Sequence, residues 1–223
     1  MSLVCQAHAK INLTLEVLSK RPDGYHEVST ILQTISLADI LTFEPNKTLD
    51  FRCDVATLQT ADNLVIKAAK LLQATTGSAI GAKIFLTKRI PIASGLGSGS
   101  TDAAATLIGL HHLWQLNLAI DKLTEIATRL GSDVSFFLSG GTAMAKGRGE
   151  WLTPLPPVSE LWLVLLEPGI EPVPNKTAQL YAKLNSSLFT SSQYTMKLAT
   201  HINHGGKVEE QFLFNVFEEV AFD

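Results

Sequence analysis

The chain has 223 residues, of which 46% are hydrophobic and 17% are charged, and its formal net charge is −3 at neutral pH. A chain of this length and composition folds into one large globular domain or two modest ones. The negative charge argues against a nucleic acid or an anionic membrane surface as the partner. The two cysteines, Cys5 and Cys53, are too few for a disulfide framework and lack metal-binding spacing.

Targeting and membrane signals are absent from the sequence pattern. The N-terminal stretch "MSLVCQAHAKINL" lacks the charged segment and the apolar segment of a signal peptide. The longest apolar run, "LWLVLL" at residues 161–166, has the length of a strand and not of a membrane span. We therefore expect a cytoplasmic protein with no membrane partner.

The first predicted element is a strand over residues 7–17, where apolar and polar side chains alternate. Its polar face carries Lys10 and Asn12. The turn sequence "RPDGYH" follows, and Pro-Asp-Gly favours a hairpin into a second strand over residues 27–37.

Helices and strands are mixed in the next part of the chain. Residues 61–77 predict a helix that is capped by Asp62 and ends near Gly77. Residues 81–92 predict a strand that leads into a glycine-rich loop, and a helix is expected from near Thr101. Another helix is expected around residues 120–130, ending at Gly131.

The last predicted elements begin with a strand in "GGTAMAKGRGEWL", which has a tight turn at residues 147–149. "TPLPP" at residues 153–157 is the best linker candidate. Residues 161–166 predict a buried strand, and a helical, polar tail follows. Because a hairpin comes first and helices do not alternate regularly with strands, the pattern favours an α+β fold over a doubly wound parallel sheet.

The glycine-rich loop in "IPIASGLGSGSTDAAATL" lies directly before a predicted helix. A helix N-terminus has unpaired N–H groups and a partial positive charge, and glycines before it let a polyanion approach the backbone. Gly95, Gly97 and Gly99 therefore indicate a phosphate cradle. The alternative is a loose connection with Thr101 as helix cap.

Three common nucleotide motifs do not fit this loop. A P-loop requires a lysine before the Ser/Thr, and none is present. The dinucleotide fingerprint requires glycine where Ser100 stands. The His-Arg-Asp and Asp-Phe-Gly sets of protein kinases are also missing.

The stretch "PIASGLGSGSTDAAA" closely resembles the phosphate-binding motif of the GHMP kinases. Three further blocks, "AHAKINLTLEVLSKRPDGYHEVSTILQTISL", "ADNLVIKAAKLL" and "LGSDVSFFLSGGTAMAKGRGE", resemble one family among them, the 4-diphosphocytidyl-2-C-methyl-D-erythritol kinases. The resemblance runs from about residue 7 to 152. Four blocks in the same order make it more specific than the loop alone.

The resemblance implies a two-domain GHMP kinase fold. It predicts an ATP-binding domain like ribosomal protein S5 domain 2 over residues 1–152, and a ferredoxin-like C-terminal domain over residues 158–223. The second domain is expected to be incomplete, because the last glycines, Gly205 and Gly206, do not match the family's third glycine-rich motif.

The implied reaction transfers the γ-phosphate of ATP, with Mg²⁺, onto the C2 hydroxyl of a cytidine-diphosphate-linked methylerythritol. Lys10 and Asp133 match the family's catalytic lysine and aspartate. A carboxylate can accept the hydroxyl proton, and an ammonium can keep that carboxylate ionised. From the residues alone, Lys10 reads as an exposed strand lysine and Asp133 as a helix cap.

The resemblance also implies binding residues; the metal ligands stay unassigned, although the hydroxyls of Ser98, Ser100 and Thr101 could bind magnesium. Asn12, Tyr25 and His26 are expected to bind the substrate, with the last two at the cytosine; the alternative is an ordinary hairpin tip. The ATP site is expected to use the loop and the start of the helix at 64, whose alternative is a helix start with a surface lysine. These residues are Pro91, Ile92, Ala93, Ser94, Gly95, Leu96, Gly97, Ser98, Gly99, Ser100, Thr101, Asn63, Leu64 and Lys67.

Two other functions remain open at this point. One is a GHMP kinase for another small alcohol such as mevalonate, against which the Tyr25–His26 pair argues, because an acceptor without a nucleobase needs no stacking ring. The other is an S5-like nucleic-acid module, which would need basic and aromatic residues interleaved on a sheet.

Family members often close the cytosine site with a second aromatic, for which Tyr181 is the nearest candidate.

Overall fold

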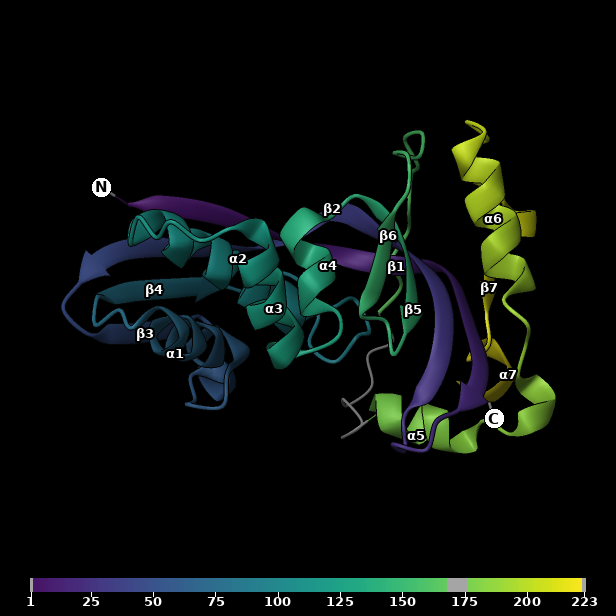
Figure 1. Ribbon diagram of the computed structural model, residues 1–223, viewed down its shortest axis with the longest axis horizontal. Helices are drawn as coiled ribbons and strands as arrows, with labels where there is room; N and C mark the ends of the chain where they lie inside the picture. The colour runs from purple at the N-terminus through teal and green to yellow at the C-terminus, as the bar shows by residue number, and fades with distance from the viewer. Residues whose placement is uncertain (1, 168–175, 222–223) are drawn as a thin grey trace. The chain divides into compact units, whose positions relative to one another are not determined.

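The computed structural model describes residues 2–167 and 176–221. The helices and strands mix as an α+β fold (Figure 1). The strands are β1 (Leu3–Lys20), β2 (His26–Asn46), β3 (Leu49–Cys53), β4 (Gly81–Thr87), β5 (Thr142–Gly147), β6 (Trp151–Pro154) and β7 (Phe214–Asn215). The α-helices are α1 (Leu64–Thr76), α2 (Ser98–Leu113), α3 (Ile120–Leu130), α4 (Val134–Ser139), α5 (Lys176–Lys183), α6 (Gln193–Asn203) and α7 (Glu218–Ala221). Short 3-10 helices span Ala56–Leu58, Ser186–Leu188 and Glu210–Phe212.

The described chain forms two compact units, each discontinuous in sequence. Unit 1 comprises residues 1–9 and 35–139, and unit 2 comprises residues 10–34 and 140–223. Strands β1 and β2 therefore contribute to both units. The sequence domains expected at 1–152 and 158–223 stay a prediction.

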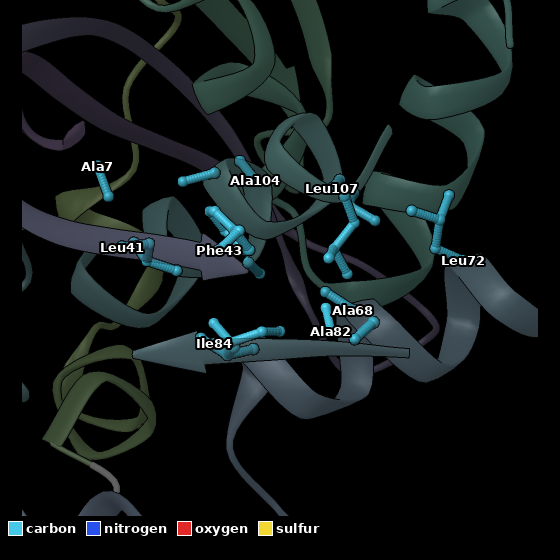
Figure 2. Close-up of a cluster of buried hydrophobic side chains, with 14 of the residues drawn as sticks. Ala7, Leu41, Phe43, Ala68, Leu72, Ala82, Ile84, Ala104 and Leu107 are labelled. Carbon is cyan, nitrogen blue, oxygen red and sulfur yellow. The ribbon is translucent and has the colours of Figure 1, made fainter. Parts of the chain in front are cut away.

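In unit 1, helices pack on a small sheet. Strand β4 pairs in parallel with β3 and antiparallel with β2, where Ile40 lies opposite Thr87 and Asn46 opposite Gly81. One apolar core joins these strands to α1, α2, α3 and α4. Figure 2 shows its side chains gathered from strands and helices, among them Leu41, Phe43 and Leu107.

The close approach of α2 to β2 depends on a glycine. A Cβ at Gly109 would lie 2.4 Å from the ring of Phe43, which is fully buried. Real Cβ atoms do not come this close, so only glycine lets the α2 backbone lie against that ring. The resulting contact fixes the helix whose first turn follows the glycine loop.

In unit 2, β2 and β5 pair antiparallel from Val28 opposite Gly147 to Gln33 opposite Thr142, and β5 continues through a tight turn into β6. Strand β7 pairs in parallel with β1. The apolar side of α6 packs on Leu13 of β1 and Ile31 of β2. A third core joins the ends of β1 and β2 to α5 and α7.

Several predicted elements are confirmed, with corrected boundaries. The hairpin is present, and α3 ends before Gly131 as expected. Helix α1 is capped by Asn63 and not by Asp62, because the Asn63 side chain accepts from the N–H of Val65. Helix α2 begins at Ser98, three residues before the expected start at Thr101, so Thr101 is not its cap.

The prediction of a buried strand at residues 161–166 is wrong. This segment has no regular secondary structure, and the side chain of Trp162 is 94% exposed. A strand requires a hydrogen-bonded neighbour. Within the described ranges, no other strand pairs with these residues.

Candidate active site

The glycine loop of unit 1 has the backbone conformation expected of a phosphate cradle. Gly95 and Gly97 have φ angles of 84° and 75°, and Ala93 also has a positive φ of 57°. Positive φ angles turn the chain so that successive N–H groups line a concave surface, which favours anions. Gly97 directly precedes the 16-residue helix α2, whose first N–H groups face out of its N-terminal end.

A buried charged cluster connects the two ends of this loop. The ammonium of Lys88, only 5% exposed, donates to Asp39, to Asp102 at 2.8 Å and to the hydroxyl of Ser98 at 2.5 Å. The other Asp39 oxygen accepts from the backbone N–H groups of Arg89 at 2.5 Å and of Ile90 at 2.9 Å. Lys88, Asp39 and Asp102 form what we name the neck cluster.

Asp102 is the least satisfied member of the neck cluster. Its second carboxylate oxygen is buried and has no hydrogen-bond partner among the described residues. Burial raises the pKa of Asp102 to about 7, although the charge and hydrogen bond of Lys88 oppose the rise. The second carboxylate, Asp39, acts in the same direction as burial.

The residues expected near the adenine hold the start of α1. Asn63 uses its carbonyl oxygen to cap the helix and its amide nitrogen to donate to the backbone oxygen of Leu58 at 2.9 Å. Lys67 forms an exposed ion pair with Asp62 at 3.1 Å. These contacts match the alternative reading of a helix start with a surface lysine, and the adenine contacts stay a prediction.

In unit 2, the polar face of β1 is covered rather than exposed. Lys10 is 7% exposed, which excludes the reading of an exposed strand lysine. Its ammonium donates to the Asn12 carbonyl oxygen at 2.8 Å, and the Asn12 amide donates to the Thr30 hydroxyl at 2.7 Å. Thr30 in turn donates to the backbone oxygen of Thr14 at 2.5 Å. This chain of hydrogen bonds orients the Lys10 side chain.

Asp133 lies in unit 1, between α3 and α4, and is half-buried. Lys10 belongs to unit 2. The pairing expected between these two side chains stays a prediction.

The hairpin tip of unit 2 gathers aromatic and cationic groups. Tyr25 is 56% exposed, and the guanidinium of Arg148 lies 4.9 Å from the centre of its ring. The imidazole of His26 stacks on the ring of Tyr181, with 4.9 Å between centres and 19° between planes. Phe189 contacts His26 edge-on, 6.2 Å between centres. The structure therefore brings Tyr181 to the same place as the predicted cytosine residues.

Glu27 connects the hairpin tip to Arg21 and to strand β5. Arg21 donates to Glu27 at 2.5 Å, and the other Glu27 oxygen accepts from the N–H of Gly147 in β5.

Burial lowers the pKa of His26, and the charge of Lys20 lowers it further. A neutral imidazole has one donor and one acceptor nitrogen, which suits the edge of a base.

Comparison with known proteins places this geometry in a family. A family model described as "GHMP kinases N terminal domain" matches residues 63–141. A Dehalococcoides mccartyi protein named 4-diphosphocytidyl-2-C-methyl-D-erythritol kinase is 46% identical over 220 residues, which cover 99% of this chain and 77% of that protein. A protein of the same name from Caldanaerobacter subterraneus is 42% identical and covers 94% and 72%.

The chain belongs to the 4-diphosphocytidyl-2-C-methyl-D-erythritol kinase family.

Solved structures agree with this family and confirm the fold. A crystal structure of 4-(cytidine 5'-diphospho)-2C-methyl-D-erythritol kinase matches with a TM-score of 0.78 and 34% identity, over 99% of this chain and 77% of that one. Phosphomevalonate kinase from Streptococcus pneumoniae matches with a TM-score of 0.67 at 13% identity, which shows the fold alone. The comparisons therefore support the family over a mevalonate-type kinase or an S5-like nucleic-acid module.

The described part of the chain holds no group of three or more His, Cys, Asp or Glu side chains that could bind a metal. Among the described helices, none has the length and apolar character to cross a bilayer.

Reasoning from the sequence missed the neck cluster. Lys88 follows a strand, where a lysine usually marks a solvent-exposed end. The available signal was that an ionisable residue follows the predicted strand at 27–37, another lies inside the predicted strand at 81–92, and a third lies at the start of the next predicted helix; these are Asp39, Lys88 and Asp102. Only the fold brings them together.

Proposed function

We propose that this protein transfers the γ-phosphate of ATP to the C2 hydroxyl of 4-diphosphocytidyl-2-C-methyl-D-erythritol. The observation that carries the proposal is the 46% identity to a kinase of that name over 99% of the chain. The glycine loop before α2 and the aromatic tip around His26 supply the two binding chemistries that this reaction needs.

The nucleotide half of the site lies at the glycine loop. The triphosphate would bind to the N–H groups of residues 95–100, where the helix dipole favours negative charge. Mg²⁺ usually keeps several waters and is held largely by substrate phosphates, so it needs no acidic cage in the protein. Such an ion would neutralise charge on the phosphates, and the part of the chain that the structure describes has no such cage.

The acceptor half uses Asp133 and Lys10. The C2 oxygen attacks the γ-phosphorus, the new O–P bond forms, the bond to the bridging oxygen breaks and ADP leaves. Asp133 accepts the hydroxyl proton as general base. Lys10, oriented by Asn12, stabilises the charge that develops on the transferred group.

The cytidine part of the acceptor would bind at the hairpin tip. Tyr25 offers an exposed ring face for stacking, and His26 offers a neutral imidazole to the base edge. Tyr181 orients His26 by stacking on it and extends the aromatic surface. Tyr25, His26 and Tyr181 together would select an acceptor that carries a nucleobase.

The proposal places this reaction in the cytoplasm, with a small-molecule substrate and with no nucleic-acid or membrane partner.

Phosphoryl transfer to a panel of acceptors tests the proposal. The full-length protein would be incubated with Mg-ATP and either 4-diphosphocytidyl-2-C-methyl-D-erythritol, unmodified methylerythritol or mevalonate, with ADP and phosphate ester measured together. We expect kcat/KM for the cytidine-linked acceptor to exceed the others by at least about 30-fold, since a lost stack and lost base hydrogen bonds each cost about 1–3 kcal/mol. Equal rates on all three acceptors would refute the proposed specificity.

A further inference from the structure

The neck cluster closes the base of the glycine loop. Lys88 stands three residues before Pro91, where the loop starts, and Ser98 begins α2, where the loop ends. The Lys88 ammonium contacts Ser98 and also Asp102, one turn further along the helix. A single side chain thus connects the two ends of a loop of seven residues, 91–97.

The segment before the loop is also held by hydrogen bonds to two carboxylates. Asp39 binds the Lys88 ammonium and the N–H groups of Arg89 and Ile90. Asp54 accepts from the backbone N–H of Lys88 at 3.0 Å. These contacts fix the path of the backbone immediately before Pro91.

Lys88 has no donor left for a ligand. An ammonium has three N–H donors, and Asp39, Ser98 and Asp102 engage all three. Its side chain is also 5% exposed, so a bound phosphate would not reach it without breaking these bonds. Its influence on a nucleotide must therefore pass through the loop and through Ser98.

Fixed ends matter because the loop binds through its backbone. A phosphate cradle works only when its N–H groups already point inward, and each residue ordered at the moment of binding weakens affinity. Ser98 accepts from Lys88, so its own hydroxyl hydrogen is not used in this bond and can donate to another group.

We propose that Lys88, bound by Asp39 and Asp102, is a positioning residue for ATP that preorganises the glycine loop and the first turn of α2. The inference rests on the proposed ATP site. It assigns to these three residues a role in nucleotide affinity, separate from binding of the alcohol acceptor and from proton transfer.

Lys88→Met removes the ammonium at nearly constant length and tests this role. Titration calorimetry would measure Kd for ATP and for the acceptor, and steady-state rates would give the KM of each. We expect Kd and KM for ATP to rise at least tenfold, while Kd and KM for the acceptor stay within twofold. Lys88→Arg, which keeps the charge, should recover part of the loss, and in a Ser98→Ala background Lys88→Met should cost less.

The control lies at the other end of the same helix. Trp114 is buried and donates to the backbone oxygen of Gly81 at 3.0 Å. Trp114→Phe removes this buried hydrogen bond, and we expect it to lower Tm without changing the Kd for ATP.

The outcomes distinguish the proposed kinase function from the proposed positioning role of Lys88. Wild-type protein that does not bind ATP refutes the proposed function. Folded Lys88→Met protein with wild-type Kd for ATP, or with equal losses for ATP and acceptor, overturns the positioning role. If Lys88→Met does not fold, Asp102→Asn replaces it, because the amide keeps the shape of the side chain but removes the negative charge that pairs with Lys88; a threefold or larger rise in Kd for ATP alone supports the role, and an unchanged Kd overturns it.

Discussion

Thr30→Val tests whether the hydrogen-bond chain on β1 orients Lys10. Valine has nearly the shape of threonine but no hydroxyl, so the variant loses the acceptor for the Asn12 amide and the donor to the Thr14 backbone oxygen. Thr30 is only 3% exposed, so water does not easily replace these bonds. A lost hydrogen bond costs about 1 kcal/mol and an unpaired buried group about 1–3 kcal/mol, so the unfolding free energy should fall by about 2–4 kcal/mol.

The effect on catalysis should exceed what destabilisation explains. Without Thr30, Asn12 no longer holds a fixed rotamer, and Lys10 loses its fixed acceptor. Misplacing a catalytic group by about 1 Å costs up to about 100-fold in rate, so we expect kcat to fall by about 10–100-fold with KM for ATP nearly unchanged. Steady-state kinetics at a temperature well below Tm would measure this.

A matched control comes from the neighbouring strand. Thr142 is also buried, and its hydroxyl donates to the Gln33 side chain at 2.7 Å, outside the chain of hydrogen bonds described for Lys10, Asn12 and Thr30. Thr142→Val should lower Tm but leave kcat within about twofold, and Thr30→Ser should keep most of the activity. A wild-type kcat for folded Thr30→Val, or equal losses of kcat for both valine variants, would refute the orienting role of Thr30.

Three further predictions follow from the loop, the hairpin tip and the neck cluster. Gly97→Val should abolish ATP binding in calorimetry while unfolding stays cooperative, because valine is strained at a φ of 75°; normal ATP affinity would contradict the cradle. Tyr181→Ala should weaken acceptor binding by about 1–3 kcal/mol and leave ATP affinity unchanged, because His26 loses its stacking partner; equal losses for both ligands would count against this assignment. Because burial raises the pKa of Asp102 to about 7, the folded protein holds this proton more tightly than the unfolded chain, so this contribution to stability is complete below pH ~4 and is lost as the pH rises through about 7. Denaturant titrations should show that Asp102→Asn flattens this decline, and an unchanged pH profile would refute the raised pKa.

Local patterns predicted much of the fold. Alternation over residues 7–17 predicted β1, Pro-Asp-Gly predicted the hairpin, and Gly131 marked the end of α3. Each of these signals depends on residues that are close in sequence. The cap of α1 was misplaced by one residue because Asp62 and Asn63 are both good caps, and only backbone geometry separates them.

The remaining features depend on contacts between distant residues. Asp39 lies 49 residues before Lys88, and Asp102 lies 14 residues after it, so no local pattern shows that their side chains meet. The run at 161–166 has the composition of a buried strand, but composition does not supply a pairing neighbour. Tyr181 was recognised as a candidate aromatic, and its stack on His26 appears only once α5 is placed within unit 2.

Single-turnover transfer from γ-³²P-labelled ATP to 4-diphosphocytidyl-2-C-methyl-D-erythritol tests the central claim most directly, with wild-type and Asp133→Asn proteins compared. The wild type should give one labelled ester, at the C2 hydroxyl, for each ADP formed. Asp133→Asn keeps the shape of the side chain and removes the base, so the rate should fall by about 10²–10⁴-fold with acceptor affinity within a few-fold. Label released as inorganic phosphate by the wild type, or a near-normal rate for Asp133→Asn, would contradict the account.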